Sequence, residues 1–332
     1  MAKMYFRYGV GKSSNLCQTA YNYNEMGMNV KVMDAANNDI ASHDNISESP
    51  IFSRKIDYMI NDSNIYEDIL RLENKPKCIL VDNAHLLSSE HAFELFLVAN
   101  LLDITVITYG DRMIDGKRSD GSMRLMELAN IIEPVEEEYI NNGRFEFYYG
   151  AMNASKTAKL LYKYHLMKEQ GYKVMLVKPA TDRNVYLVKS RVGLEAKADI
   201  ILDRGNDIFI PKDTDYVLVD EAQFLESKQI DEMKNICRNS KTNIRCYGLK
   251  NDFRTYHFEG SGRLLETATN IVKMKTICRC GDGAEFNARM DLEGNYLSDG
   301  ESVCVDDGKS VKYTSLCPKC YIEKVLKLKK GK

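Results

Sequence analysis

The chain contains an internal repeat, and this repeat constrains the fold more than any other feature. A shift of 144 positions lays "YFRYGVGKSSNLCQTAYNYNEMGMNVKV" over "YGAMNASKTAKLLYKYHLMKEQGYKVML" without a gap, so that Lys12 falls on Lys156. A shift of 138 lays "CILVDNAHLL" over "YVLVDEAQFL", and one of 139 lays "GSMRLMELA" over "GSGRLLETA". Chance similarity between two amphipathic α/β segments is the alternative, but the matches recur in one order. We therefore predict a tandem duplication.

Each copy is predicted to alternate strands with helices. In the second copy "RFEFYY" predicts a strand, "SKTAKLLYKYHLMKEQ" carries apolar residues at helical spacing, and "YKVMLVKP" is a short apolar run. "TDYVLVDEAQF" and "NIRCYGL" predict two further buried strands, each beside a helical stretch. This alternation indicates an α/β fold with a mostly parallel sheet, whose ligands bind beyond the carboxyl ends of the strands.

A phosphate-binding loop is predicted between the first strand and the first helix of the second copy. "GAMNASKT" follows the pattern GxxxxGK[ST], except that Ser155 replaces the second glycine. In such loops the backbone N–H groups surround the phosphates, the lysine reaches the β and γ groups, and the hydroxyl helps to hold Mg²⁺. Lys156 and Thr157 supply these last two groups. An ordinary helix N-cap is the alternative for "SKT" alone.

Two carboxylates complete the predicted site. Asp220 ends the apolar strand "YVLV", as expected of the acid that organises Mg²⁺, and Glu221 beside it can accept a proton from an acceptor hydroxyl. Together with the phosphate loop, this pair predicts phosphoryl transfer from ATP with Glu221 as the catalytic base. The predicted nucleotide-binding residues are Gly150, Met152, Asn153, Ala154, Ser155, Lys156, Thr157 and Asp220.

Four cysteines towards the end of the chain predict a structural Zn²⁺ site. The pairs Cys278 with Cys280 and Cys317 with Cys320 are separated by a hairpin-like insert, which is typical of a tetrahedral thiolate site. The first pair is CxC, tighter than the usual CxxC. Free buried cysteines are the alternative, and Cys304, between the pairs, is a candidate substitute ligand.

The composition argues against several classes of partner. The 46 basic and 48 acidic residues leave no excess of positive charge of the kind that binds duplex nucleic acid or an anionic membrane. No run of 18 apolar residues occurs, and "MAKMYFRYGV" lacks the apolar core of a signal peptide. The nine cysteines fit a reducing compartment. We expect a cytoplasmic protein that binds neither nucleic acid nor membranes.

Five motifs of the second copy occur together in one known family. They are "GAMNASKT", "VKPATD", "VDEAQFL", "YGLKNDFRTYHFEGS" and the cysteine-rich tail "ICRCGDGAEFNARM" with "YTSLCPKCY", in that order between residues 145 and 322. In this combination the second copy resembles the type II thymidine kinases of bacteria and their phages. The resemblance implies transfer of the ATP γ-phosphate to the 5′-hydroxyl of thymidine or deoxyuridine, in the host cytoplasm if the chain is phage-encoded. It also implies a RecA-like domain followed by a small zinc-binding domain.

The resemblance further implies roles for individual residues, with Glu221 as the general base. It assigns the nucleoside pocket to Met152, Asp182, Phe224, Leu249, Phe253 and Phe258, and places Tyr313 on a lasso-like loop that closes over thymine. Plain core packing is the alternative for the aromatic residues taken alone. The chain departs from the family at Ser155 and in "TDRN", where Arg183 directly follows Asp182 and Asn184 takes the usual place of the arginine.

The first copy has lost much of this chemistry. Gly11, Lys12 and Ser13 preserve the end of a phosphate loop, but Phe6 replaces its opening glycine and Asn83 replaces the catalytic glutamate. Asparagine cannot take a proton at neutral pH. His85 stands where the second copy has Gln223, and both a weak base role and a structural role are open. We predict an inactive copy that is structural or regulatory, with nucleotide binding at Gly11 and Lys12 left open.

The predicted architecture is two RecA-like P-loop kinase domains with mostly parallel sheets, the second followed by a zinc-binding lasso domain. The predicted boundaries are 1–135 for the degenerate domain, 136–144 for an acidic linker, 145–275 for the kinase domain and 276–332 for the zinc-binding domain. The resemblance implies assembly from equal subunits, so a homo-oligomer of pseudo-dimeric chains and a monomer are both compatible with the sequence.

Three functions are compatible with these observations. A thymidine kinase that uses ATP and Mg²⁺ is favoured by the intact set of Lys156, Thr157, Asp220 and Glu221. A non-catalytic nucleotide-binding pseudokinase is the alternative, because of Ser155 and the altered "TDRN". A P-loop ATPase that acts on nucleic acid is the third, and the charge balance opposes it.

Overall fold

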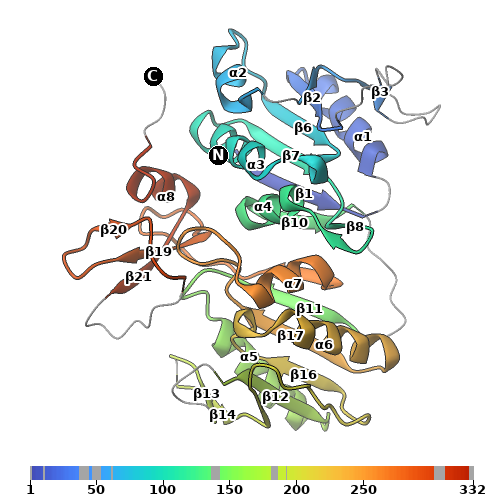
Figure 1. The fold of residues 1–332 in the computed structure, drawn as a ribbon, viewed down its shortest axis with the longest axis vertical. Helices are drawn as coiled ribbons and strands as arrows, with labels where there is room; N and C mark the ends of the chain where they lie inside the picture. The colour runs from blue at the N-terminus through green and yellow to red at the C-terminus, as the bar shows by residue number, and fades with distance from the viewer. Residues whose placement is uncertain are drawn as a thin grey trace. The chain divides into compact units, whose positions relative to one another are not determined.

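The computed structural model describes residues 2–9, 12–36, 45–46, 54–60, 63–135, 143–180, 186–191, 193–302 and 311–328. Five residues named above lie outside these ranges, as does most of the predicted linker: Gly11, Asp182, Arg183, Asn184 and Cys304. Contacts between residues divide the chain into two compact units, Met1–Glu137 with Leu328–Lys332, and Glu138–Lys327. Figure 1 draws both units, and each is described by itself.

The first unit is built around a six-stranded sheet in which all neighbours are parallel. The strand order is β10 (Ile131–Pro134), β1 (Met4–Tyr8), β7 (Thr105–Tyr109), β6 (Cys78–Asp82), β2 (Val30–Asp34) and β5 (Tyr58–Met59). The helices are α1 (Lys12–Glu25), α2 (Ile65–Arg71), α3 (Ser89–Leu101) and α4 (Asp120–Leu128), with a 3₁₀ turn η1 (Ala84–Leu86). Two small hairpins are formed by β3 (Asn45–Ile46) with β4 (Arg54–Lys55), and by β8 (Met113–Ile114) with β9 (Lys117–Arg118). Helix α1 packs Leu16 and Ala20 against Val32 and Leu80 of the sheet, which buries one face of the helix.

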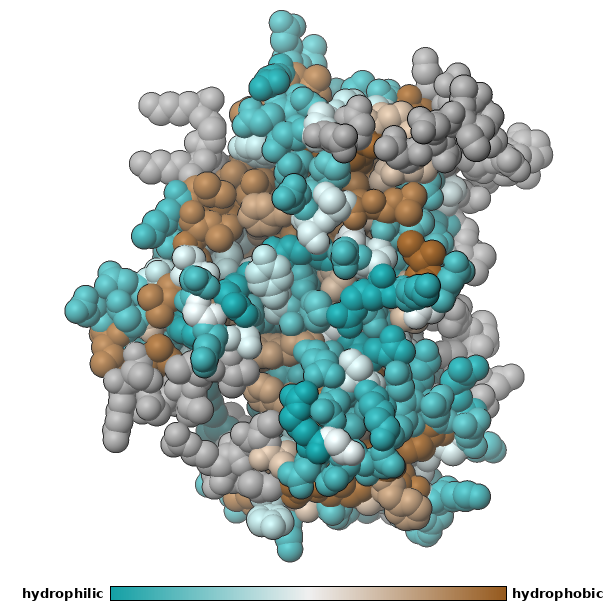
Figure 2. All heavy atoms as spheres, in the orientation of Figure 1, coloured by the Kyte–Doolittle hydropathy of each residue, from teal (hydrophilic) through white to brown (hydrophobic). Residues whose placement is uncertain are grey.

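The second unit has a parallel six-stranded sheet of its own. The strand order is β15 (Ile200–Leu202), β12 (Val174–Pro179), β16 (Tyr216–Val219), β17 (Asn243–Gly248), β11 (Phe145–Tyr149) and β18 (Asn270–Lys273). The helices are α5 (Lys156–Glu169), α6 (Ser227–Asn239) and α7 (Glu259–Thr267), with a 3₁₀ turn η2 (Ala222–Phe224) and a hairpin of β13 (Leu187–Lys189) and β14 (Glu195–Lys197). Helix α6 buries Ile230 and Met233, while Figure 2 shows hydrophilic residues over its outer side. This pattern is that of a helix covering a sheet.

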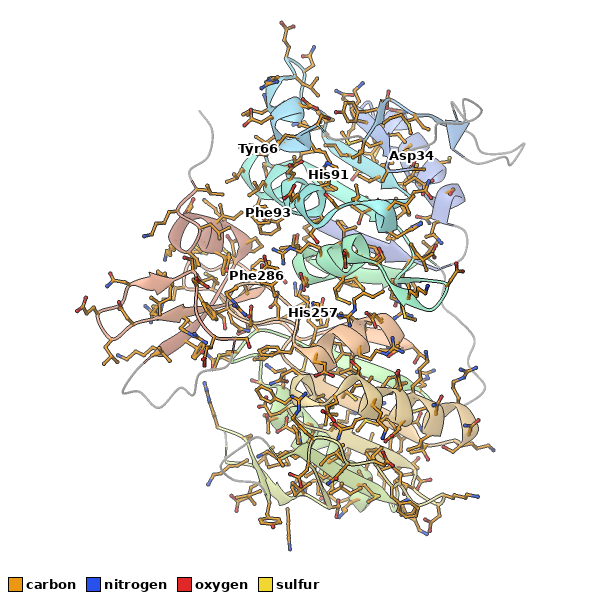
Figure 3. The ribbon with its side chains drawn as sticks, viewed as in Figure 1. Asp34, Tyr66, His91, Phe93, His257 and Phe286 are labelled. Atoms are coloured by element: carbon orange, nitrogen blue, oxygen red, sulfur yellow. The ribbon has the colours of Figure 1, made fainter. Side chains whose placement is uncertain are left out.

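A small antiparallel sheet follows the main sheet of the second unit. Its central strand β19 (Phe286–Met290) pairs with β20 (Tyr296–Leu297) and β21 (Lys312–Leu316), and α8 (Pro318–Lys324) follows directly. Phe286, labelled in Figure 3, is fully buried with its ring centre 5.2 Å from that of Tyr321 on α8. This aromatic pair packs the helix onto the small sheet.

The two large sheets have the same topology. Read from β18 to β15, the second sheet follows chain segments in the same order as the first sheet read from β10 to β5. In both, the strand that ends in the acidic motif runs into a left-handed residue and then a 3₁₀ turn: Asn83 has φ 49° before η1, and Glu221 has φ 51° before η2. The predicted fold class, α/β with two mostly parallel sheets, is confirmed.

The register of the strands corrects one part of the gapless alignment. Phe6 pairs with Thr108 and Ile132, and the residue with corresponding neighbours in the second sheet is Phe147, which pairs with Cys246 and Ile271. The prediction that Phe6 replaces the opening glycine is therefore wrong. Gly9 follows β1 as Gly150 follows β11, but Gly9 and Lys12 are three positions apart whereas Gly150 and Lys156 are six apart. The loop of the first unit is thus shorter by three residues.

In the part of the chain that the structure describes, no helix combines the length and the apolar character needed to cross a membrane.

Candidate active site of the second unit

The phosphate loop of the second unit connects β11 to α5. Ser155 immediately precedes the helix with φ 56° and ψ 30°, and its side chain caps no backbone group. Glycine adopts this left-handed conformation freely, whereas a residue with a Cβ pays about 1–2 kcal/mol for it. The glycine of the usual pattern is therefore required by the backbone angle, and Ser155 keeps that angle at a cost in strain.

Gly150, which opens the loop, is required for a different reason. A Cβ at this position would lie 2.8 Å from the carbonyl oxygen of Met274 and 2.8 Å from the Cβ of Ala154. Only glycine allows the chain to leave β11 so close to the end of β18.

Lys156 turns its side chain back over the loop. The Nζ atom donates to the carbonyl oxygens of Gly150, at 3.2 Å, and Ala151, at 3.0 Å. Burial lowers the pKa of Lys156 to about 8, although the nearby carboxylates of Glu221 and Asp220 act in the opposite direction. The amine thus lies in a desolvated position where an anionic ligand would restore its full charge.

Thr157 and Asp220 connect the start of α5 to the end of β16. The hydroxyl of Thr157 donates to Oδ1 of Asp220 at 3.2 Å. Asp220 is buried, and this burial, together with the neighbouring Glu221, raises the pKa of its carboxyl. A hydroxyl and a carboxylate side by side next to a phosphate loop are the oxygen ligands that Mg²⁺ uses, often through water.

Glu221 is held by a residue that the sequence analysis did not single out. Its Oε2 accepts a hydrogen bond from Nε2 of Gln223 at 2.6 Å, and Oε1 of Gln223 accepts from the backbone N–H of Leu249 at 3.0 Å. Gln223 therefore fixes the carboxylate between β16 and the end of β17. The position of Gln223, two residues after Glu221 in "DEAQF", was the sequence signal that could have identified it.

One cavity of about 340 Å³ brings much of the predicted site together. It is lined by Met152, Asn153, Ala154, Ser155, Lys156, Thr157, Ala158, Lys189, Ser190, Arg191, Glu221 and Leu249. The phosphate loop and the carboxylate of Glu221 therefore share one space, of a size typical of small-molecule sites. Lys189, Ser190 and Arg191 come from the β13–β14 hairpin, which the sequence analysis did not connect with the site.

The residues that the resemblance assigns to the nucleoside pocket are distributed over three places. Leu249 and Met152 line the cavity of the phosphate loop, while Phe224 and Phe258 line a neighbouring pocket, with their ring centres 5.7 Å apart. Phe253 is buried beneath the guanidinium of Arg289, 3.8 Å from its ring centre. The hydroxyl of Tyr313 accepts a hydrogen bond from Nε of Arg289 at 2.8 Å.

The four predicted metal ligands converge. The sulfur atoms of Cys278, Cys280, Cys317 and Cys320 all lie within 4.8 Å of one another. Sulfur atoms around a tetrahedral Zn²⁺ are about 3.8 Å apart, given Zn–S bonds of about 2.3 Å. The donor set and its spacing therefore fit a structural zinc ion. The other described cysteines, Cys17, Cys78, Cys237 and Cys246, are buried as expected for core residues.

The small antiparallel sheet, which lies next to the four cysteines in the chain, supports the phosphate loop directly. The backbone N–H of Met152 donates to Oδ1 of Asn287 on β19 at 2.7 Å, and its carbonyl accepts from the hydroxyl of Ser315 on β21 at 2.6 Å. The side chain of Asn287 also donates to the carbonyl of Asn251 at 3.0 Å. Asn287 and Ser315 carry no sequence signal of this role, because it depends on strand packing rather than on a motif.

Comparison with known proteins gives a consistent result. The family model described as "Thymidine kinase" matches residues 2–137 and 143–321. The chain belongs to the thymidine kinase family. A thymidine kinase of Enterobacteria phage T4 is 39% identical over 191 residues, covering 55% of this chain and 97% of that protein. Thymidine kinases of Albidiferax ferrireducens, 35% identical over 182 residues, and Photobacterium profundum, 36% identical over 186 residues, cover 53% of this chain and 90% and 95% of their own lengths.

The thymidine kinase family match includes the first unit, but the residues at the corresponding site make different contacts there. The Lys12 amine donates to the carbonyl of Gly9 at 2.9 Å and forms an ion pair with Asp111 at 2.7 Å. By the strand register, Asp111 occupies the place of Leu249. The lysine of the first unit is therefore neutralised by a carboxylate from the same unit.

A charge reversal is found at the end of β2. Asp34, labelled in Figure 3, occupies the place of Lys178 and accepts a hydrogen bond from the side chain of Asn83 at 2.9 Å. The contact between the helix hydroxyl and the strand-end acid is retained, because Ser13 donates to Asp82 at 3.0 Å. The strand order of the second unit thus recurs in the first unit, with acids in the places of Lys178 and Leu249 and the neutral Asn83 in the place of Glu221.

Proposed function

We propose that the second unit transfers the γ-phosphate of ATP to the 5′-hydroxyl of thymidine or deoxyuridine. The observation that carries this proposal is the shared cavity of Lys156 and Glu221, since phosphoryl transfer requires the phosphates and the base of the acceptor hydroxyl in one space. The matches to proteins named thymidine kinase, over 97% and 90% of the lengths of those proteins, support thymidine as the acceptor.

The reaction follows from the groups that line the cavity. The loop from Gly150 to Thr157 binds the triphosphate through its backbone N–H groups, and Lys156 lies over the β and γ groups. Glu221 takes the proton from the 5′-hydroxyl as the oxygen bonds to the γ-phosphorus and the bond to the β-phosphate oxygen breaks, releasing ADP. Mg²⁺, when bound near Thr157 and Asp220, supplies charge neutralisation for the phosphates.

We further propose the roles that the resemblance implies for the nucleoside and the metal. Met152, Asp182, Phe224, Leu249, Phe253, Phe258 and Tyr313 form the nucleoside site. Zn²⁺ bound by Cys278, Cys280, Cys317 and Cys320 is structural, because the module that carries it positions Met152 through Asn287 and Ser315. Residues 145–275 form the kinase domain and 276–332 the zinc-binding domain.

For residues 1–135 we propose a duplicated kinase domain that has become structural and binds no nucleotide. The shared strand order supports the duplication. The loop is three residues shorter than that of the second unit, so it provides fewer backbone N–H groups for phosphate. The amine of Lys12 is already paired with the carboxylate of Asp111.

Replacement of the proposed base tests the function. Glu221→Gln keeps an oxygen that can accept from Gln223 but cannot take a proton, so we expect kcat for thymidine phosphorylation to fall by about 100-fold or more with little change in either KM. The measurement is ADP and thymidine monophosphate formation with Mg²⁺. Lys197→Gln, an exposed change on β14, serves as the control. A Glu221→Gln enzyme as fast as the wild type would contradict the assignment.

The pseudokinase alternative is favoured by the left-handed Ser155, whose strain bears on the phosphate site. It predicts that the wild type produces no thymidine monophosphate under the same assay. Turnover by the wild type rejects this alternative.

A further inference from the structure

We propose that Arg191 binds the phosphate end of the nucleoside triphosphate, as a second cation beside Lys156. This inference rests on the proposed ATP site of the second unit and adds to it a residue that lies outside every motif discussed above.

The hairpin that carries Arg191 is anchored in the core. Val188 on β13 is fully buried in the cluster that also contains Leu160 and Leu161 of α5. The amine of Lys178 donates to the carbonyl of Leu187 at 3.2 Å, which connects β13 to the end of β12. The base of the hairpin is therefore fixed relative to both the main sheet and the helix that begins at the phosphate loop.

The turn at the tip of the hairpin fixes the backbone at Ser190, directly before Arg191. The backbone N–H of Ser190 donates to the carbonyl of Leu194 at 2.8 Å, and the hydroxyl of Ser190 accepts from the N–H of Leu194 at 3.0 Å. Gly193, with φ 92°, allows the chain to reverse here. Arg191 directly follows Ser190 and lines the cavity, where its side chain reaches Asn153 of the phosphate loop.

The charge of Arg191 is not neutralised within the cavity. Its guanidinium donates to the side-chain oxygen of Asn153 in the phosphate loop, and an amide oxygen carries no net charge. The described residues include no carboxylate that forms an ion pair with Arg191, whereas Lys189, two positions earlier, pairs with Glu195 at 3.5 Å.

The cavity as a whole favours an anion. Three basic side chains line it, Lys156, Lys189 and Arg191, and Lys189 is already paired with Glu195. Lys156 and Arg191 therefore face the single lining carboxylate, that of Glu221. Arg191 is close enough to Lys156 to contribute to the lowering of its pKa, so the two cations act on the same volume. A triphosphate, with several negative charges, would relieve this repulsion.

Guanidinium chemistry suits this position. Lysine offers a compact charge, whereas the planar guanidinium can donate two parallel hydrogen bonds to phosphoryl oxygens and spreads its charge over them. In phosphoryl transfer such an arginine also stabilises the charge that develops on the transferred group. Arg191 comes from the hairpin and Lys156 from the phosphate loop, so the two cations would hold the phosphates from two separate elements.

Binding of a non-hydrolysable ATP analogue with Mg²⁺ tests the proposal without requiring turnover. We expect Arg191→Ala to raise the Kd by about 10- to 100-fold, the loss typical of hydrogen bonds to a charged group. Arg191→Lys should recover part of the affinity, because it restores the charge but not the paired geometry. The KM for thymidine should stay within about twofold of the wild type, since the proposed contact is with phosphate only.

Lys197→Ala is the matched control. It removes one positive charge from the same hairpin at an exposed position on β14 that does not line the cavity. If Arg191→Ala and Lys197→Ala bind the analogue as tightly as the wild type, the proposal is wrong. If the wild type binds the analogue but phosphorylates no thymidine, the proposed function fails while the comparison of Kd values still decides the role of Arg191.

Discussion

At the scale of single residues, the backbone angle of Ser155 makes the strongest prediction about stability. A serine with φ 56° is strained, so Ser155→Gly should stabilise the second unit by about 1 kcal/mol, the cost of the left-handed region less the added freedom of glycine in the unfolded chain. Urea unfolding of the ligand-free protein measures this. Ser155→Ala keeps the Cβ and should give no gain. Equal effects of Gly and Ala would show that the angle is not the cause.

Residue chemistry also sets the limit of what the sequence could predict about the site. Lys156, Thr157, Asp220 and Glu221 were found because each stands in a motif whose chemistry is local. Arg191 and Asn287 reach the same loop from other elements, and only packing brings them there. A sequence pattern contains no record of such contacts, so these residues were missed.

At the scale of elements, the small antiparallel sheet and the proposed zinc site beside it lead to a prediction about the phosphate loop. Cys320→Ala removes one of the four proposed zinc ligands, and β19 and β21 hold Met152 through Asn287 and Ser315. We expect loss of bound zinc and a fall in thymidine kinase activity of about tenfold or more. Elemental analysis measures the zinc content, and the formation of ADP and thymidine monophosphate measures the activity. Cys17→Ala, in the first unit, should keep about one zinc per chain. Full zinc content and activity in Cys320→Ala would refute the assignment.

Strand register explains where the sequence reading of elements was wrong. The order of strands and helices could be predicted because their apolar runs are clear in both copies. The gapless alignment nevertheless misplaced Phe6, because an unbroken match through α1 concealed the three residues missing from the loop before it. Pairing of β1 with β7 places Gly9 at the opening of that loop, and this pairing is a long-range property.

At the scale of the whole molecule, two similar sheets pose the question of how many nucleotides one chain binds. The second unit offers Lys156 and Lys178 against Asp220 and Glu221, with the neutral Leu249 at the end of β17. The first unit offers Lys12 against Asp34, Asp82 and Asp111. A triphosphate entering the first unit would have to break the ion pair of Lys12 and approach an excess of negative charge.

We therefore expect one ATP analogue per chain, measured by calorimetry with Mg²⁺. Lys156→Ala should abolish this binding, while Lys12→Ala, the matched change in the first unit, should leave the number of sites and the Kd unchanged. Asp111→Leu frees Lys12 but does not restore the three missing loop residues, so it should also leave one site. A stoichiometry of two, or a loss of binding in Lys12→Ala, would mean that the first unit retains a nucleotide site. Both units have the same strand order, so a difference in nucleotide binding between them would come from the length of the loop and the charges around it. These would be the properties that distinguish a binding domain from a structural one.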